Sequence, residues 1–474
     1  MPYISTRDGR APPARLSFED ALVAGLAADG GLYVPEAWPR FDAAALKALA
    51  GKSYAEIAAA VMEPFIENTL ARDAWQRLVA EAYRGFTHEA VAPLKQLGAS
   101  LWLMELFHGP TLAFKDYALQ ILGPLFDAVL ARRGERVTVI GATSGDTGSA
   151  AIEACRDRSS IDIFILYPHR RVSDVQRRQM TTVDSANVHA VAIEGTFDDC
   201  QDLVKAMFAD GPFRARLNLS AVNSINWARI MAQVVYYVAA AVALGAPERP
   251  VGFAVPTGNF GNVYAAHVAR RMGVPIAELI IGTNRNDILA RFINQGRMTI
   301  GAVEPSLSPS MDIQVSSNFE RLYFELAARD GAAVAAAFRA FRETGALPAS
   351  PALWQEARAL FAAHRVDDDE TRATIRETWR ATGELLDPHG AVAVAAARAV
   401  RRDPQVPMVA LACAHPAKFP EAVTSAVGFP ATPPPRLAAL LRRPERITVL
   451  PNELAAVERF VRERARRPQE VATP

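Results

Sequence analysis

The sequence has few cysteines and no excess of charge of either sign. Three cysteines, widely spaced along 474 residues, exclude a disulfide framework and a cysteine-based zinc site. Lysine plus arginine number 52 and aspartate plus glutamate 51, so the net charge is +1. Such a chain has no general attraction for nucleic acid. An anionic ligand must therefore be attracted by local charges in a cleft.

Long hydrophobic runs are also missing. No stretch of about eighteen apolar residues is present, which excludes a membrane-spanning helix. The N-terminus lacks a basic region followed by an apolar stretch, so we expect no signal peptide. These features favour the reducing cytoplasm, and we expect no metal site and neither nucleic acid nor membrane as partner.

What the sequence does contain is an alternation of strand-like and helix-like stretches. Such alternation predicts an α/β fold with a mainly parallel sheet wrapped by helices. Ligands in such folds bind beyond the carboxyl ends of the strands. The strand-like runs are residues 101–106, 137–140, 161–166, 188–193, 251–255 and 408–412, with helices expected at 198–208 and 228–244.

The length predicts two or three domains. We expect an N-terminal domain at 1–95, two further domains at 96–245 and 246–430, and a C-terminal tail at 431–474 that includes a charged helix at 455–466. The alanine-rich residues 319–383 show no strand signal and predict a helical insertion.

One loop follows the strand at 251–255 and precedes a helix that we expect to end near Gly273. Its sequence, residues 256–262, is PTGNFGN. Glycines allow backbone amides to approach an anion, and the dipole of the following helix favours negative charge. Asn259 and Asn262 add side-chain donors. The alternative is a tight turn that merely requires glycine.

A second loop, residues 141–148 with the sequence GATSGDTG, lies between the strand at 137–140 and a helix. Small hydroxyls and glycines suit a carboxylate or phosphate. The loop is neither a Walker A loop nor a dinucleotide fingerprint. The alternative is a helix N-cap supplied by Asp146 or Thr147.

A lysine, Lys115, lies in the mostly apolar segment HGPTLAFKD, residues 108–116. Burial disfavours the ammonium form and lowers a lysine pKa, which assists Schiff-base chemistry. The alternative is a surface lysine with a buried stem. The three segments together favour a lysine nucleophile beside two sites rich in backbone N–H groups.

The set of motifs resembles the threonine synthase family, of the longer fungal and proteobacterial type. The further matching segments are residues 29–35 (DGGLYVP), 223–226 (NSIN), 387–390 (DPHG) and 414–419 (AHPAKF). The resemblance implies fold type II of the pyridoxal 5′-phosphate (PLP) enzymes, which is similar to the tryptophan synthase β subunit. It also implies an N-terminal threonine synthase-like domain and a helical insertion.

The resemblance further implies an activity. An enzyme of this family holds PLP on Lys115, the catalytic residue, as a Schiff base. It converts O-phospho-L-homoserine and water to L-threonine and phosphate, the last step of threonine biosynthesis, by γ-elimination and β-addition of water. The cofactor contacts then expected are Lys115, Gly258, Asn259, Phe260, Gly261, Asn262, Asp146 and Cys413. The substrate contacts expected are Thr143, Ser144, Gly145, Thr147, Asn223, Ser224, Asn226 and Arg229.

Several of these assignments have alternatives. Arg229 is suited to bidentate phosphate binding or is a solvated helix arginine. Cys413 stands where the family usually has a threonine facing the pyridine nitrogen, and a thiol is the weaker hydrogen-bonding group. Lys418 attracts the leaving phosphate or is a surface lysine, whereas His108 and Asp116 are expected to support the lysine segment.

Three rival functions remain open at this stage. A serine or threonine dehydratase of the same fold releases ammonia and a keto acid. A non-catalytic sensor binds PLP or a phosphorylated metabolite without turnover. An interaction scaffold binds no PLP and is colourless.

Overall fold

The structure is a computed structural model that describes residues 1–143, 145–220 and 225–466. The chain divides into two compact units. Unit 1 comprises the described residues of 1–22, 26–114 and 224–432, and unit 2 those of 23–25, 115–223 and 433–474. The chain passes from unit 1 to unit 2 at the peptide bond between Phe114 and Lys115.

Unit 1 is built on a sheet with the strand order β13-β10-β9-β14-β4-β3. The strands run parallel except β3, which is antiparallel to β4. Their bounds are β3 Leu94–Gln96, β4 Leu101–Glu105, β9 Val251–Pro256, β10 Ile276–Thr283, β13 Phe361–Arg365 and β14 Met408–Ala412, and two small ladders pair β1 Tyr3–Ser5 with β2 Tyr33–Pro35 and β11 Met298–Thr299 with β12 Ala346–Leu347.

Helices cover this sheet, and one of them lies directly on it. α17 (Pro388–Val400) packs against β9, β10 and β14, and its alanines and valines share a core with Leu103, Ile280 and Ala410. The small side chains let the helix approach the sheet closely. The other helices of unit 1 are α2 Ala43–Lys47, α3 Tyr54–Ile66, α4 Arg72–Arg84, α10 Trp227–Ala243, α11 Gly261–Arg271, α12 Ile288–Gln295, α13 Phe319–Leu326, α14 Gly331–Thr344, α15 Pro351–Leu360, α16 Asp368–Thr382 and α18 Pro420–Val427, with the 3-10 turns Pro309–Met311 and Pro416–Lys418.

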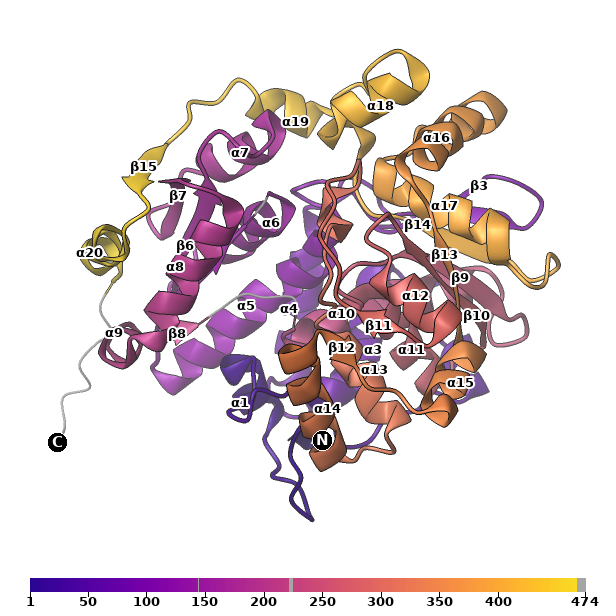
Figure 1. Cartoon of the computed structure of the whole chain (residues 1–474), viewed down its shortest axis with the longest axis horizontal. Helices are drawn as coiled ribbons and strands as arrows, with labels where there is room; N and C mark the ends of the chain where they lie inside the picture. The colour runs from indigo at the N-terminus through magenta and orange to yellow at the C-terminus, as the bar shows by residue number, and fades with distance from the viewer. Residues whose placement is uncertain (144, 221–224, 467–474) are drawn as a thin grey trace. The chain divides into compact units, whose positions relative to one another are not determined.

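Unit 2 is built on a parallel sheet with the strand order β15-β7-β6-β5-β8 (Figure 1). The central strand β6 is buried along its whole length, as parallel strands covered on both faces are. The strands are β5 Val137–Ala142, β6 Ile161–Pro168, β7 Val188–Glu194, β8 Leu219–Ser220 and β15 Thr448–Pro451, and the helices are α5 Lys115–Arg133, α6 Asp146–Cys155, α7 Asp174–Thr181, α8 Phe197–Ala209, α9 Gly211–Leu217, α19 Pro435–Leu440 and α20 Leu454–Arg464; α1 Phe18–Ala24 spans the boundary between the units.

Residues 448–465 contribute to the core of unit 2. β15 pairs in parallel with β7, and in Figure 1 α20 lies in yellow at the outer side of this sheet. Val457, Phe460 and Val461 of α20 pack with Phe164 and Ile193. The C-terminal tail therefore adds a strand to one edge of the sheet and a helix that packs with the residues of its core.

The predicted alternation of strands and helices is confirmed, but several strands were not predicted, among them β10, β13 and β15. Residues 319–383 are largely helical, as expected, but they also contain β12 and β13. β13 pairs in parallel with β10, so that Leu279 lies opposite Phe361. It begins directly where α15 ends, and no turn residue marks the change.

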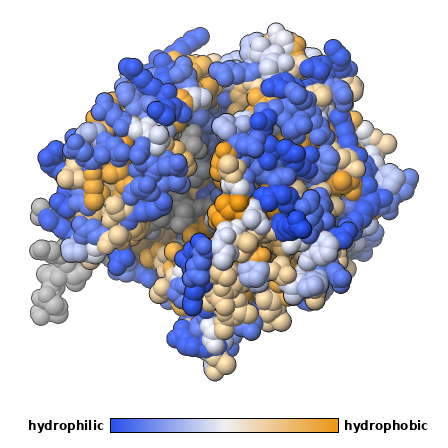
Figure 2. Space-filling model, viewed as in Figure 1, coloured by the Kyte–Doolittle hydropathy of each residue, from blue (hydrophilic) through white to orange (hydrophobic). Residues whose placement is uncertain are grey.

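The surface is mostly hydrophilic on the face shown in Figure 2, with hydrophobic residues in small groups. Among the described residues, no helix has both the length and the apolar character that crossing a membrane requires.

Candidate active site

Lys115 is the first residue of α5, and the residues before it are tied to the end of β14. The Phe114 amide donates to the Cys413 carbonyl at 2.8 Å, and the His415 amide donates to the Leu112 carbonyl at 3.0 Å. Leu112 has a φ of 60°, an uncommon conformation for a residue with a side chain. These bonds fix the backbone that leads into Lys115.

Lys418 supports the same segment. Its side chain is 1% exposed, and its Nζ donates to the Thr111 carbonyl at 2.8 Å. The interpretation of Lys418 as a surface lysine is therefore wrong. An attraction of the leaving phosphate by Lys418 stays a prediction.

Within unit 2, Lys115 faces a carboxylate from the next strand-to-helix loop. Its Nζ lies 3.8 Å from Oδ2 of Asp146, and both side chains are buried. Nε2 of Gln176, on α7, donates to Oδ1 of Asp146 at 3.1 Å. The expected burial of Lys115 is confirmed, and the interpretation as a surface lysine is wrong. Asp146 is held where it stabilises the positive charge of the amine.

The loop between β5 and α6 is organised by Thr143. Its Oγ1 accepts hydrogen bonds from the amides of Gly145, at 3.0 Å, and Gly148, at 2.9 Å. Both glycines lie in crowded positions, because a Cβ on Gly145 would meet the side-chain amide of Gln176 and one on Gly148 would lie 2.5 Å from Cγ2 of Thr143. Ser144 lies outside the described residues.

The alternative interpretation of this loop was a side chain that caps the following helix. A side chain does cap it, but this side chain is Thr143 rather than Asp146 or Thr147. Asp146 is the first residue of α6 rather than its cap, and the residue in the cap position, Gly145, has no side chain to bond with. Thr143 satisfies the free amides at this helix end instead. Its hydroxyl still has a proton to donate, so substrate binding by Thr143 stays a prediction, as it does for Gly145 and Thr147.

The phosphate-binding loop predicted at 256–262 joins β9 to α11, as expected. Phe260 is the N-cap residue of α11 and has a φ of 65°, a strained conformation of the kind found at functional sites. Its ring packs edge-on against Phe319, at a centroid distance of 5.2 Å, and Phe361, at 5.7 Å. The side chain is thus turned into an aromatic cluster, while the loop amides lie at the positive end of a helix.

Asn262, in the first turn of α11, is held by two tyrosines and a thiol. Its Oδ1 accepts from the hydroxyls of Tyr236, at 2.5 Å, and Tyr237, at 2.7 Å. Its Nδ2 donates to Sγ of Cys413 at 3.8 Å. Burial raises the pKa of Tyr237 well above its usual value, so this phenol remains a donor. Cys413 therefore lies beside the phosphate-binding loop, in the same unit.

Arg229, in the first turn of α10, is a buried cation. Its exposure is 3%, and its Nε and Nη1 have no hydrogen-bond partner among the residues that the structure describes. Burial lowers the pKa of Arg229 to about 10. The interpretation as a solvated helix arginine is wrong, because a guanidinium buried in this way requires an anion.

Asn226, three residues earlier, caps the same helix. Its Oδ1 accepts from the Ala228 amide at 3.0 Å, and its Nδ2 donates to the Leu22 carbonyl at 2.9 Å. The oxygen and the nitrogen of this side chain both make hydrogen bonds within the protein. A contact between Asn226 and the substrate stays a prediction. Asn223 and Ser224 lie outside the described residues.

His108 belongs to a group of charges at the end of β4. Its Nε2 lies 2.8 Å from Oε2 of Glu105, and Nζ of Lys95 lies 2.9 Å from Oε1. Burial opposes the charge of Glu105, but the hydrogen bonds from His108 and Lys95 outweigh it and lower the pKa of Glu105. This pairing suits the structural role expected of His108. Asp116 is fully buried.

Known proteins similar to this chain match it over nearly its whole length. It is 57% identical to the threonine synthase of Pseudomonas aeruginosa over 98% of this chain and 99% of that protein. The chain belongs to the threonine synthase family. Family models for the threonine synthase N terminus, for pyridoxal-phosphate dependent enzymes and for the threonine synthase C-terminal region match residues 2–83, 86–413 and 390–461.

Two solved threonine synthase structures have the same fold. The PLP-bound threonine synthase of Brucella melitensis has a TM-score of 0.96 at 53% identity and covers 98% of this chain and 100% of its own. The yeast threonine synthase has a TM-score of 0.92 at 38% identity and covers 98% of both chains. The predicted family and the predicted fold, the PLP fold of threonine synthases, are confirmed, and the chain is a PLP-dependent enzyme.

The residues of this chain fit PLP. The cofactor requires an amine for its aldehyde and a site for its phosphate. A nine-tenths buried lysine amine is present in unit 2. In unit 1, the loop before α11 places backbone amides at the N-terminus of that helix. A helix N-terminus is a usual binding site for a phosphate.

The residues that support the two predicted binding loops were not predicted from the sequence. Gln176 holds Asp146, and Tyr236 and Tyr237 hold Asn262. These partners lie 25 to 30 positions away along the chain, where helical or strand spacing gives no signal. Only the tyrosine pair in the middle of an apolar helix indicates such a partner in the sequence, because buried phenols require hydrogen-bond partners.

Unit 1 also has a cavity of about 370 Å³ at the far end of α11. It is lined by Arg40, His267, Arg270, Arg271, Leu322, Glu325, Leu326, Glu356 and Leu360. None of the residues predicted to bind cofactor or substrate is among them, so this cavity is separate from the candidate site.

Proposed function

We propose that this chain converts O-phospho-L-homoserine and water to L-threonine and phosphate. Membership of the threonine synthase family supports this reaction. Lys115 carries PLP and moves the protons, the loop of residues 257–262 binds the cofactor phosphate, and Arg229 binds the phosphate of the substrate. The remaining predicted contacts, including Asp146 and Cys413, keep the roles that the family resemblance implies.

The observation that carries the proposal is the state of Arg229. A buried guanidinium without a carboxylate costs several kcal/mol unless an anion joins it. A phosphate monoester supplies the oxygen pair that a guanidinium binds bidentately. Serine and threonine, the substrates of a dehydratase, lack a phosphate and would leave Arg229 uncompensated. The arginine therefore favours a phosphorylated substrate.

Lys115 does the proton chemistry in this proposal. PLP, when bound, spreads the negative charge that develops at the substrate α-carbon. Nζ of Lys115 takes the proton from Cα and serves the later transfers at Cβ and Cγ, since the amine stays beside the same face. Asp146, 3.8 Å from this amine, stabilises Nζ whenever it holds the proton.

We also propose that the enzyme works in the cytoplasm on small molecules and not on nucleic acid. All three cysteines are buried thiols, which suits a reducing compartment. The net charge of +1 gives no general attraction for a polyanion.

The test is an assay of phosphate and threonine release from O-phospho-L-homoserine, run beside an assay of keto acid release from serine and threonine. We expect the first pair of products in equal amounts. Arg229→Gln should raise KM for phosphohomoserine roughly a hundredfold, the loss of a charge-assisted pair, and leave the affinity for PLP unchanged.

Arg271→Gln is the matched control, because Arg271 is half-exposed on α11 and lies outside the candidate site. Its KM should equal that of the wild type. Keto acid release without threonine formation would instead identify a dehydratase. An unchanged KM in Arg229→Gln would remove Arg229 from the substrate site.

A further inference from the structure

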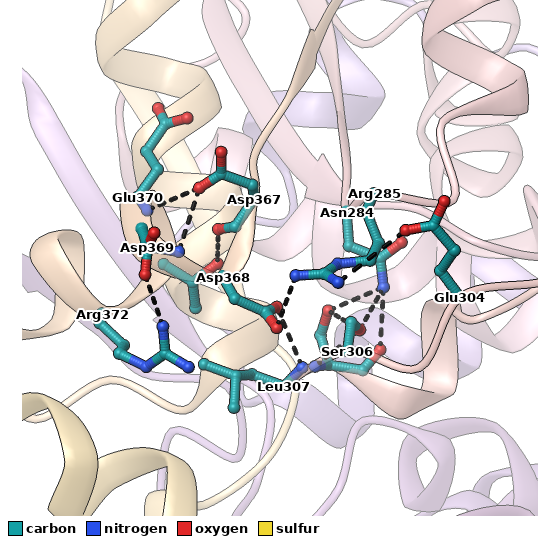
Figure 3. A network of polar contacts seen from close by, with 12 residues as sticks. Asn284, Arg285, Glu304, Ser306, Leu307, Asp367, Asp368, Asp369, Glu370 and Arg372 are labelled. Carbon is teal, nitrogen blue, oxygen red and sulfur yellow. Dashed lines mark hydrogen bonds and ion pairs between the residues drawn. The ribbon is translucent and has the colours of Figure 1, made fainter.

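A network of polar contacts connects the end of β10 to the segment that follows β11. Asn284 comes directly after β10, and Figure 3 shows its side chain pointing toward Ser306. Nδ2 of Asn284 donates to Oγ of Ser306 at 2.7 Å. In the same view Arg285 reaches Asp368 of α16, with 2.9 Å between Nη2 and Oδ2. The Leu307 amide also donates to Oδ1 of Asp368 at 3.2 Å, so the segment is held from one helix and one strand end.

Asp312 is the acceptor at the centre of this network. Its Oδ1 accepts from Nδ2 of Asn284 at 2.7 Å, Nδ2 of Asn286 at 3.1 Å and Oγ of Ser306 at 2.6 Å. Its Oδ2 accepts from the Ser306 amide at 3.0 Å. Hydrogen bonds to an ionised carboxylate are about twice as strong as neutral ones. The carboxylate therefore fixes the conformation of residues 306–312.

The next residues of this segment lie against the phosphate-binding loop. Oγ of Ser316 donates to the Gly258 carbonyl at 2.7 Å, and the Asn318 amide donates to the Asn259 carbonyl at 3.1 Å. A Cβ on Gly258 would lie 3.1 Å from Cα of Met311. A side chain at Gly258 would therefore crowd the backbone of this segment, which is a further reason for glycine beside the two expected from the sequence, the approach of an anion and a tight turn.

The same loop is held directly by β10 as well. The Thr257 amide donates to the Gly282 carbonyl at 2.8 Å, two residues before Asn284. Asp312 therefore closes a ring of contacts that runs from the end of β10, through residues 306–318, to the carbonyls of Gly258 and Asn259.

We propose that Asp312 is a positioning residue that holds the phosphate-binding loop in the shape that binds PLP. The inference rests on the proposed role of residues 257–262. Asp312 touches neither cofactor nor substrate and acts through Ser316 and Asn318. A loop that must order itself on binding loses affinity, because the ordering free energy is subtracted from the contacts it makes.

The test is the dissociation constant for PLP of full-length apo-protein, measured by titration. Asp312→Asn keeps the shape but replaces one acceptor oxygen by a donor. It should weaken PLP binding roughly tenfold, the cost of one charge-assisted hydrogen bond. At saturating PLP, KM for phosphohomoserine should stay unchanged.

Asp367→Asn is the matched control. Asp367 accepts from the amides of Asp369 and Glu370 within α16, and asparagine caps helices equally well. Its PLP affinity should match the wild type. If Asp312→Asn does not fold, Ser306→Ala removes two of the same hydrogen bonds and should give a similar loss.

A double-mutant cycle with Ser316→Ala separates positioning from a general loss of stability. If Asp312 acts through this segment, the two losses of affinity are not additive. Additive losses, or an unchanged PLP affinity in Asp312→Asn and Ser306→Ala, would overturn the inference. Gly261→Val tests the loop itself, since a Cβ there would lie 3.2 Å from Nδ2 of Asn318 and 3.3 Å from Cδ1 of Ile230. An unaffected PLP affinity in Gly261→Val would reject the loop assignment, not the role of Asp312 alone.

Discussion

The amide of Phe114 donates a hydrogen bond of 2.8 Å to the carbonyl of Cys413. Phe114 immediately precedes Lys115, and Sγ of Cys413 accepts from Nδ2 of Asn262 at the start of α11. A single residue thus connects the backbone of the lysine segment with the helix that follows the phosphate-binding loop. The backbone of Phe114 is thus held by the residue that directly follows β14.

Lys115→Ala should abolish activity and the visible absorption of bound PLP. The reason is the loss of the amine to which the aldehyde attaches. Borohydride treatment of the wild-type enzyme followed by mass spectrometry should find a pyridoxyl group on the peptide that contains Lys115. Full turnover by the alanine variant would refute the assignment.

Cys413→Thr should preserve the fold and shift the absorption spectrum of the bound cofactor. The hydroxyl is the stronger hydrogen-bonding group, and the whole threonine side chain is close in volume to that of cysteine. The measurement is a visible spectrum together with kcat, which we expect to change less than tenfold, or about 1.4 kcal/mol. Cys200→Ser, at a buried cysteine of unit 2, is the control and should leave the spectrum as it is.

Thr143→Val should destabilise the protein by about 1–3 kcal/mol, because two buried amides lose their acceptor. The free energy of unfolding in urea measures this directly. Thr143→Ser retains the oxygen and should recover most of the loss. Equal stability of the valine variant and the wild type would show that Oγ1 is not the acceptor that fixes this loop.

His267 should make the protein less stable as the pH falls. Burial lowers its pKa to about 3, so the folded protein keeps this imidazole neutral while the unfolded chain takes up a proton near pH 6.5. Stability is therefore lost from pH 6.5 downward, by roughly 2 kcal/mol at pH 5. His267→Gln should flatten the curve of unfolding free energy against pH in this range; a curve parallel to that of the wild type would contradict the prediction.

How far the sequence predicts the structure depends on how many residues separate two contacting residues along the chain. The strand, loop and helix around residues 137–155 and 251–271 follow local patterns, and both were predicted within a few residues. Thr143 was not recognised as the cap, because its bond to the Gly148 amide spans five residues and exceeds the usual N-cap spacing. The role of Asp312 depends on Asn284, which is 28 residues earlier and has no periodic relation to it.

The burial of Arg229 could be predicted only from the helix as a whole. An arginine in the first turn of a helix is normally solvated. The apolar character of α10 on every side, from Trp227 to Ala243, is the feature that should have suggested a buried helix.

The place of β15 has a consequence for folding during synthesis. This strand is made after the other strands of its sheet, yet it completes one edge of the sheet whose inner strand β5 leads into Thr143 and Asp146. Until β15 has been made, β7 has an unpaired edge that is open to other chains. Nascent chains of this enzyme are therefore exposed to aggregation until β15 pairs with β7.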